Sequence, residues 1–370
     1  MHATTIPDRL SRLRARLVEQ SIDAVLVSQP ENRVYLSGFT GSAGILFISA
    51  DLAIVATDFR YFAQLSLESP CFELVKVTST FADVLPEILG RRSKCCNSIS
   101  AMKRLGFESD HVTVGDSQEW MGAAPDTEWV PTQGLVMDMR AIKDADEIQT
   151  LSEAIRLTDE ALAAALAQVW QGMTERQLAW LIETYIRTHG APAVSFDIIV
   201  AAGPNGARPH ARASDAALPA GEPIVIDMGA RVGGYCADLT RTICLGQPRD
   251  PDRFWGIYNT VLRAQQAAEA AIRPGLTGKE VDAVAREVIS EAGYGELFGH
   301  GLGHGVGLAV HEMPRLSRLA TAPLVSGNVV TVEPGIYLSG WGGVRIEDVV
   351  LVTESGVEVL TKAPKDPIVS

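Results

Sequence analysis

The sequence lacks the features of several broad protein classes. Its 370 residues include only five Cys, and no CxxC pair indicates a zinc knuckle or a redox site. Basic residues are the minority, since 32 Lys and Arg stand against 45 Asp and Glu, and the net charge of −13 argues against nucleic-acid binding. An odd cysteine count without paired spacing fits a reducing compartment better than a disulfide framework.

Long apolar segments are missing as well. The opening residues, MHATTIPDRLSRLRARL, contain no apolar core of a secretory signal, and they predict an amphipathic helix with Leu10, Leu13 and Leu17 on one face. No run is long and uncharged enough to cross a bilayer. We therefore expect a cytoplasmic protein without a membrane segment. The composition, 46% apolar and 21% charged, is that of a globular protein, and the length suffices for two domains.

The pattern of the chain changes after residue 130. Before it, helical and strand-like stretches alternate in a mixed α/β pattern, with a helix near 8–20 and strand candidates at 24–27, 44–49, 52–58 and 104–109. After it, Asp144 and Glu147 form the pattern of a helix capping box. We predict an N-terminal domain over residues 1–133, a linker over 134–145 and a catalytic domain over 146–370.

The second half contains an internal repeat. The segment GMTERQLAWLIETYIRTHGA (172–191) matches GLTGKEVDAVAREVISEAGY (275–294), with Gly, Thr and a second Gly at equivalent places. In each copy a capping box predicts the start of a helix and the second Gly predicts its end. Each copy continues to a hairpin pattern that carries two acids, which indicates a duplicated unit.

In the first hairpin, a turn at 232–233 sets Asp227 opposite Asp238. Opposed residues of an antiparallel pair lie about 5 Å apart on one face, where like charges are destabilising unless a cation lies between them. A solvent-facing acid pair is the alternative reading, but the apolar flanks favour burial.

The second hairpin repeats the arrangement, since a turn centred on Gly340 sets Glu333 opposite Glu347. A pseudo-two-fold relation would bring all four carboxylates into one site.

Histidines supply the remaining candidate ligands. The segment 299–312 holds His300, His304 and His311, and its glycines favour a strand or a tight loop over a helix. His210 lies in the equivalent stretch of the first copy. Four carboxylates and one imidazole suit Mn²⁺ first, with Co²⁺, Zn²⁺ or Fe²⁺ as alternatives. So many carboxylates can bridge two ions about 3.5–4 Å apart.

These motifs resemble those of the Xaa-Pro peptidases, aminopeptidase P and prolidase, which have the pita-bread metallopeptidase fold. IDMGA, ADLTRT, HGLGH, TVEPGIY and VRIED look like the family's ligand motifs, so the resemblance implies two divalent metal ions held by Asp227, Asp238, His304, Glu333 and Glu347. The segments 35–44, 57–61 and 139–148 extend the resemblance over nearly the whole chain. The fold class it implies is α/β (α+β): a creatinase-like N-terminal domain followed by a pita-bread domain of two halves.

The resemblance, with physical reasoning, also implies roles. Glu333 is expected to act as general base, while His311 and His210 stabilise the oxyanion or orient the scissile carbonyl. His300 is expected to shape the proline pocket. Arg345 either orients the carboxylates or binds substrate, unless it is simply an exposed strand residue.

Arg315 lies where some prolidases bind the C-terminal carboxylate of a dipeptide, although a surface Arg after a turn Pro explains it equally well. We expect aminopeptidase P, acting on short peptides with proline at the second position, and the alternative is prolidase, an Xaa-Pro dipeptidase. A methionine aminopeptidase would not carry the N-terminal domain or the PHARAS segment. A metal-free creatinase-like amidinohydrolase or a non-catalytic binding protein should have lost ligand residues, and none is lost. A homodimer is also expected, without nucleic-acid or membrane partners.

Overall fold

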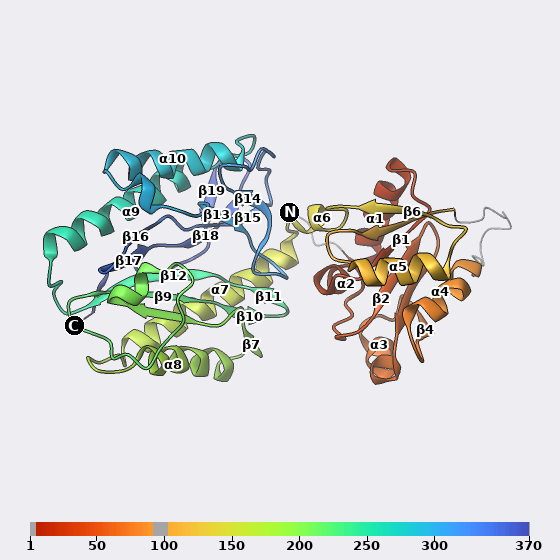
Figure 1. The fold of residues 1–370 in the computed structure, drawn as a ribbon, viewed down its shortest axis with the longest axis horizontal. Helices are drawn as coiled ribbons and strands as arrows, with labels where there is room; N and C mark the ends of the chain where they lie inside the picture. Colours follow the sequence, from red (N-terminus) through yellow and green to blue (C-terminus); the bar gives the residue numbers. More distant parts are fainter. Residues whose placement is uncertain (1–4, 92–102, 370) are drawn as a thin grey trace. The chain divides into compact units, whose positions relative to one another are not determined.

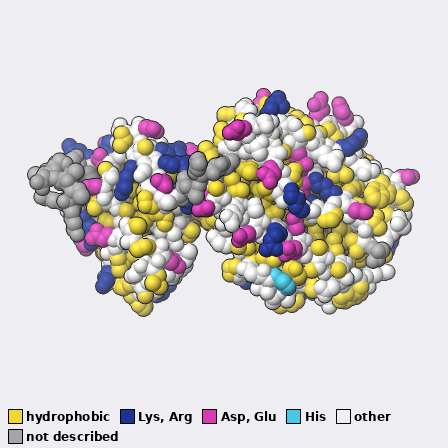
Figure 2. All heavy atoms as spheres, turned by 180° about the vertical axis from the view of Figure 1, so that it is seen from behind, with side chains coloured by type: hydrophobic (Ala, Val, Ile, Leu, Met, Phe, Trp, Pro, Cys, Tyr) yellow, Lys and Arg dark blue, Asp and Glu magenta, His cyan; other side chains and the backbone are white. Residues whose placement is uncertain are grey.

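The computed structural model describes residues 5–91 and 103–369, which form two compact units divided between Arg140 and Ala141 (Figure 1). Of the five cysteines, Cys95 and Cys96 lie outside the described residues, and the other three are free thiols. In the described part of the chain, no helix is long and apolar enough to cross a membrane. On the face shown in Figure 2, the described Lys and Arg side chains are interspersed with Asp and Glu.

The N-terminal unit is built on a six-stranded sheet in the order β4-β3-β2-β1-β5-β6. Strands β1 to β3 pair antiparallel, and the other pairs are parallel. The predicted helix is confirmed as α1, which buries Leu10, Leu13 and Leu17. The elements are α1 (Ile6–Glu19), β1 (Ala24–Val27), α2 (Pro30–Ser37), β2 (Ile45–Ser49), β3 (Ala53–Thr57), η1 (Phe59–Tyr61), α3 (Phe62–Glu68), β4 (Glu73–Lys76), α4 (Phe81–Gly90), β5 (Arg104–Glu108), α5 (Val114–Ala123), β6 (Glu128–Thr132) and α6 (Met137–Arg140).

In the C-terminal unit, strands lie between the helix pair α7 and α8 and the helix pair α9 and α10 (Figure 1). Each pair packs on its own apolar core. The elements are α7 (Ala145–Leu166), α8 (Glu175–Thr188), β7 (Ala193–Val194), β8 (Ile199–Ala202), η2 (Gly203–Ala207), β9 (Pro223–Met228), β10 (Ala230–Val232), β11 (Tyr235–Cys236), β12 (Leu239–Leu245), α9 (Pro251–Ala271), α10 (Gly278–Glu291), η3 (Gly295–Leu297), β13 (Gly303–Gly305), β14 (Glu312–Leu316), β15 (Val329–Val332), β16 (Gly335–Leu338), β17 (Gly342–Arg345), β18 (Asp348–Val352), β19 (Val357–Val359) and β20 (Ile368–Val369).

The duplication predicted from the sequence is visible in the backbone. Helices α8 and α10 each have 14 residues and begin with capping boxes at Thr174 and Thr277. Gly172 and Gly275, two residues before these caps, have nearly equal φ angles of 96° and 93°. A left-handed conformation of this kind favours glycine, so the sequence match reflects a shared local structure.

The first hairpin differs from the prediction in its register. Its turn lies at 233–234, where both glycines have positive φ (56° and 88°), so that Asp227 pairs with Thr240 instead of Asp238. Two adjacent glycines accept such a turn without steric cost, which moves the turn by one residue and the pairing by two. Because side chains alternate between the faces of a strand, a shift by two keeps both acids on the same face.

The second hairpin has the predicted register. Strands β16 and β17 pair about Gly340, and β15 and β18 continue the same alignment, which sets Glu333 opposite Glu347. The glycine-rich segment is not helical, as expected, and contributes β13 between β14 and β15.

Candidate metal centre

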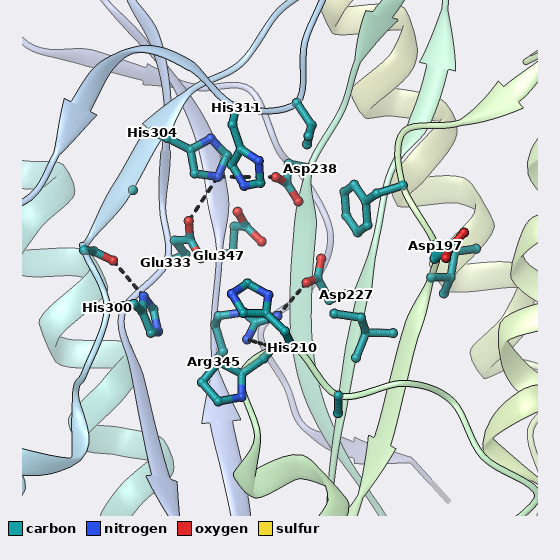
Figure 3. A pocket seen from close by; sticks show the side chains of 18 of the residues that line it. Asp197, His210, Asp227, Asp238, His300, His304, His311, Glu333, Arg345 and Glu347 are labelled. Carbon is teal, nitrogen blue, oxygen red and sulfur yellow. Dashed lines mark hydrogen bonds and ion pairs between the residues drawn. The ribbon is translucent and has the colours of Figure 1, made fainter. Parts of the chain in front are cut away.

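Five side chains from the two halves of the C-terminal unit point toward one another in a cavity of about 780 Å³ (Figure 3). They are Asp227, Asp238, His304, Glu333 and Glu347. His304 Nε2 lies 3.2 Å from Glu333 Oε1 and 3.6 Å from Asp238 Oδ2. Ligand atoms of Asp238, His304 and Glu347 all lie within 4.8 Å of one another. The structure thus brings together the whole set that the sequence singled out.

Neighbouring polar groups orient these side chains. His304 Nδ1 donates to Gly305 O at 3.1 Å, which leaves Nε2 facing the carboxylates with its lone pair available. Glu347 Oε2 accepts a hydrogen bond from Thr240 at 2.7 Å. Asp227 Oδ1 is buried and has no hydrogen-bond partner among the described residues. A buried carboxylate oxygen without a partner is costly, and a cation would satisfy it, so this donor set fits divalent metal ions.

The electrostatics of the five side chains agree with this fit. Burial and the repulsion of Glu347 and Asp227 raise the pKa of Asp238 well above its usual value. Burial and the charges of Glu333 and Asp227 do the same to the pKa of Glu347. Burial also raises the pKa of Glu333, but when His304 carries a proton on Nε2 as well as on Nδ1, its hydrogen bond and charge outweigh burial and lower that pKa to about 2. Carboxylates so close together repel one another unless protons or cations lie between them.

Arg345 is not the exposed strand residue that one reading of the sequence allowed. Its side chain is buried, and Nη2 lies 2.6 Å from Asp227 Oδ2. Nε donates to Thr240 Oγ1 at 2.9 Å, and Nη1 donates to Tyr337 Oη at 2.8 Å and to Pro209 O at 3.3 Å. All three guanidinium nitrogens therefore have protein partners, which supports the role of orienting the carboxylates over that of binding substrate.

A hydrogen-bonded chain continues from Arg345 to His300. His300 Nδ1 lies 2.7 Å from Gly301 O, and because a carbonyl only accepts, this nitrogen carries the proton. Nε2 must then accept from Tyr337 Oη at 3.0 Å, while Tyr337 accepts from Arg345. Burial lowers the pKa of His300, which keeps the neutral form that this chain requires. The ring of His300 is thus held in one orientation at the cavity wall.

The other candidate residues line the cavity near its opening. His311 and His210 are exposed, and the His311 ring centroid lies 4.3 Å from that of His304. Burial, with the charges of His304 and Arg315, lowers the pKa of His311 to about 4. Arg315, on β14, is exposed and lines the same cavity. Pro314 lies within β14 and not in a turn, so the position of Arg315 at the cavity fits carboxylate binding better than the turn reading.

The sequence analysis gave no role to Tyr337 or Thr240. A signal for Tyr337 was present, since residues 333, 335 and 337 alternate onto one face of an extended segment. Thr240 had no such signal, because its contact with Glu347 joins two hairpins that are remote in the sequence.

Comparison with known proteins decides the family. Residues 149–354 match Metallopeptidase family M24, and residues 9–142 match the Creatinase/Prolidase N-terminal domain. The chain belongs to metallopeptidase family M24. The predicted fold class, a creatinase-like domain followed by a pita-bread domain, is thereby confirmed.

Three relatives of this M24 chain are similar over nearly their full lengths. The "Xaa-Pro dipeptidase" of Pyrococcus horikoshii is 36% identical, with 98% of this chain and 99% of the relative covered. A solved Xaa-Pro dipeptidase from Bacillus anthracis is 40% identical, with a TM-score of 0.90 and coverage of 98% and 99%. A solved X-Pro aminopeptidase from Thermotoga maritima is 39% identical, with a TM-score of 0.89 and the same coverage.

Proposed function

We propose that this M24 metallopeptidase hydrolyses the bond before proline at the N-terminus of short peptides, with two divalent metal ions. The observation that carries the proposal is the meeting of four buried or half-buried carboxylates and His304 in one cavity. The names of the three relatives, all of them Xaa-Pro peptidases, support the substrate class. The cavity volume lies within the range of small-molecule sites, roughly 300–1,000 Å³.

Five side chains would hold the two ions. They are Asp227, Asp238, His304, Glu333 and Glu347, which all line the cavity. We propose Mn²⁺ as the metal because oxygen donors predominate. When bound, such ions would supply a nucleophilic water and stabilise negative charge on the attacked oxygen.

The chain's own residues would supply the proton transfers and the orientation. Glu333, whose carboxylate lies in the cavity 3.2 Å from His304 Nε2, would accept the proton of the attacking water as general base. His311 is neutral above pH 4 and can donate its remaining N–H to the oxyanion. His210, near the cavity opening, would share this task. His300 and the side chains around it would form the wall of the pocket that holds the proline ring.

The relatives support the dipeptidase alternative better than the aminopeptidase P expected from the sequence. The Pyrococcus horikoshii and Bacillus anthracis proteins are both named Xaa-Pro dipeptidases. Arg315 is an exposed cation at the cavity, which could pair with the free carboxylate of a dipeptide. We therefore propose an Xaa-Pro dipeptidase. Aminopeptidase P stays the second candidate, since the Thermotoga maritima relative is an X-Pro aminopeptidase.

A comparison of substrates tests the choice. The Mn²⁺-loaded protein is given an Xaa-Pro dipeptide, its C-terminal amide and an Xaa-Pro-Yaa tripeptide. A dipeptidase should cleave the free dipeptide with the highest kcat/KM, and Arg315→Gln should remove most of that preference. Equal or better cleavage of the tripeptide would favour aminopeptidase P, and no cleavage of any of the three would reject the proposal. The proposed homodimer is tested on the same preparation by light scattering.

A further inference from the structure

Glu175 is a buried carboxylate outside the cavity that contacts the segment bearing His210. It is the first residue of α8 and is fully buried. Oε1 accepts a hydrogen bond from Ala202 N at 2.7 Å. Oε2 accepts three more, from Asn205 Nδ2 at 2.8 Å, from Ser214 N at 2.8 Å and from Ser214 Oγ at 2.6 Å. One side chain thus joins both ends of the segment 203–213, called here the His210 loop.

The His210 loop has other contacts as well, since η2 packs against β9, β16 and β17, and Asn205 Nδ2 donates to Arg212 O at 3.2 Å. It leaves β8 through the short helix η2 and contains no strand. Toward the site, Pro209 O accepts from Arg345 at 3.3 Å. Hydrogen bonds to an ionised acceptor are roughly twice as strong as neutral ones, and a carboxylate at a helix N-terminus also interacts favourably with the helix dipole. Glu175 is therefore the side chain that ties the two ends of the loop to each other and to α8.

In the second copy of the duplicated unit, different residues anchor the loop that carries a histidine of the cavity. The position equivalent to Glu175 is Gly278, so the first turn of α10 carries no acid there. One turn further along, the buried Asp282 accepts hydrogen bonds from Leu302 N at 3.0 Å and from Arg286 at 2.8 Å. Arg286 in turn donates to His300 O at 2.9 Å. In both halves a buried acid on the duplicated helix secures the loop that carries a histidine of the cavity.

We propose that Glu175 is a positioning residue for catalysis, which holds His210 over the metal centre through the loop. It touches neither the cavity nor the proposed ligands, so its effect must pass through His210. The inference rests on the proposed function, because it assigns His210 to the reaction. A displacement of about 1 Å in a catalytic group can cost up to about 10²-fold in rate, so a loosened loop should reduce kcat measurably.

The test is a double-mutant cycle on the Mn²⁺-loaded protein. Glu175→Gln keeps the shape of the side chain but replaces one acceptor oxygen by an amide N–H₂. Because all partners of Glu175 are donors, this group cannot form their hydrogen bonds, and the anchor is broken. We expect kcat to fall about tenfold with unchanged metal content. In a His210→Ala background the same change should alter kcat less than about twofold, since residues that act through one group are not additive. Asn205→Ala removes one of the four donors to Glu175, together with the bonds of Asn205 to Arg212 O and Arg208 inside the loop, and should give a loss of the same kind.

Glu108→Gln is the matched control. Glu108, in the N-terminal unit, is also buried and accepts from Ser28 N, Gln29 N and Asn32 Nδ2. The variant Glu108→Gln should lower the melting temperature without changing kcat. Wild-type kcat in both Glu175→Gln and Asn205→Ala, or an equal loss with and without His210, would overturn the proposal.

An activity-independent measurement separates failure of the anchor from failure of the proposed function. Hydrogen exchange followed by mass spectrometry should show faster exchange in peptides of the His210 loop in Glu175→Gln, and unchanged exchange there in Glu108→Gln. Unchanged exchange in the loop of Glu175→Gln rejects the anchor, whatever the substrate proves to be. A wild-type protein that cleaves no Xaa-Pro substrate rejects the proposed function and with it the catalytic part of the inference.

Discussion

Replacement of Arg345 by Gln tests whether this arginine offsets the charge of the carboxylate cluster. The Arg345 side chain is 5% exposed, and its Nη2 is 2.6 Å from Asp227 Oδ2. Removing one partner of a buried ion pair costs about 3–5 kcal/mol, because the remaining charge is left uncompensated. For a cooperative unit of roughly 150–250 residues, such as the C-terminal one, that loss corresponds to a melting temperature lower by roughly 6–20 °C for the metal-free protein.

The loss should be smaller when metal is bound, because a divalent cation compensates Asp227 in place of the guanidinium. Ion binding to the native state alone also stabilises it by mass action. The melting temperature of Arg345→Gln should therefore rise more on addition of Mn²⁺ than that of the wild type. Differential scanning calorimetry with a chelator and with Mn²⁺ measures both values for each protein.

Arg241→Gln provides the control for a buried arginine whose charge pairs with an acid outside the cluster, and whose contact with the cluster is the hydrogen bond from Nη1 to the backbone carbonyl of Glu347. Arg241 Nη2 pairs with Asp348 Oδ1 at 2.8 Å, and both side chains are at most 3% exposed. Asp348 also pairs with Lys365. The loss of stability caused by Arg241→Gln should be the same with and without Mn²⁺. If Arg345→Gln also loses the same amount in both conditions, the arginine does not act on the charge of the cluster and the reasoning is refuted.

Three further outcomes are expected. His311→Ala should lower kcat about 10²–10³-fold at unchanged metal content, as loss of one oxyanion donor does, and a variant that has lost its metal would contradict the role. A chelator should abolish activity while circular dichroism shows the fold retained, and full activity without metal would exclude a metallopeptidase mechanism. The third concerns Glu269, for which burial and the charge of Asp348 raise the pKa to about 7. The native state then binds more protons than the unfolded state between about pH 4.5 and 7, so stability should fall as pH rises through this window, by at most about 3 kcal/mol. Glu269→Gln should flatten that slope in urea denaturation, and an unchanged slope would assign it to other groups.

Features encoded by neighbouring residues could be predicted from the sequence. The capping boxes at Asp144, Thr174 and Thr277 involve residues three apart, and all three form as predicted. The turn about Gly340 was also predictable, because a glycine with positive φ (79°) stands at its centre. Local signals of this kind do not depend on the tertiary structure, so one sequence is enough to read them.

The hydrogen bonds around the carboxylates could not be predicted in this way. The partners of Arg345 come from the loop after η2, β9, β12 and β16, so each bond depends on the packing of remote segments. An arginine two residues before a proposed ligand gives no local sign of whether it is exposed. Glu175 is a similar case, since a first-turn acid is ordinary in any helix and only the fold brings four donors to it.

The predicted register of the first hairpin was wrong, but the predicted site residues still lie together. The wrong register hid the role of Thr240. The predicted pairing set Asp227 directly opposite Asp238, where like charges are most repulsive. The observed pairing sets Thr240 opposite Asp227 and makes the two acids diagonal neighbours, which in such pairs are about 7–8 Å apart instead of about 5 Å. The wider separation leaves room for cations between the acids. It also puts the Thr240 hydroxyl where it accepts from Arg345 and donates to Glu347, so the residue that separates the acids of the first hairpin also orients one of the second.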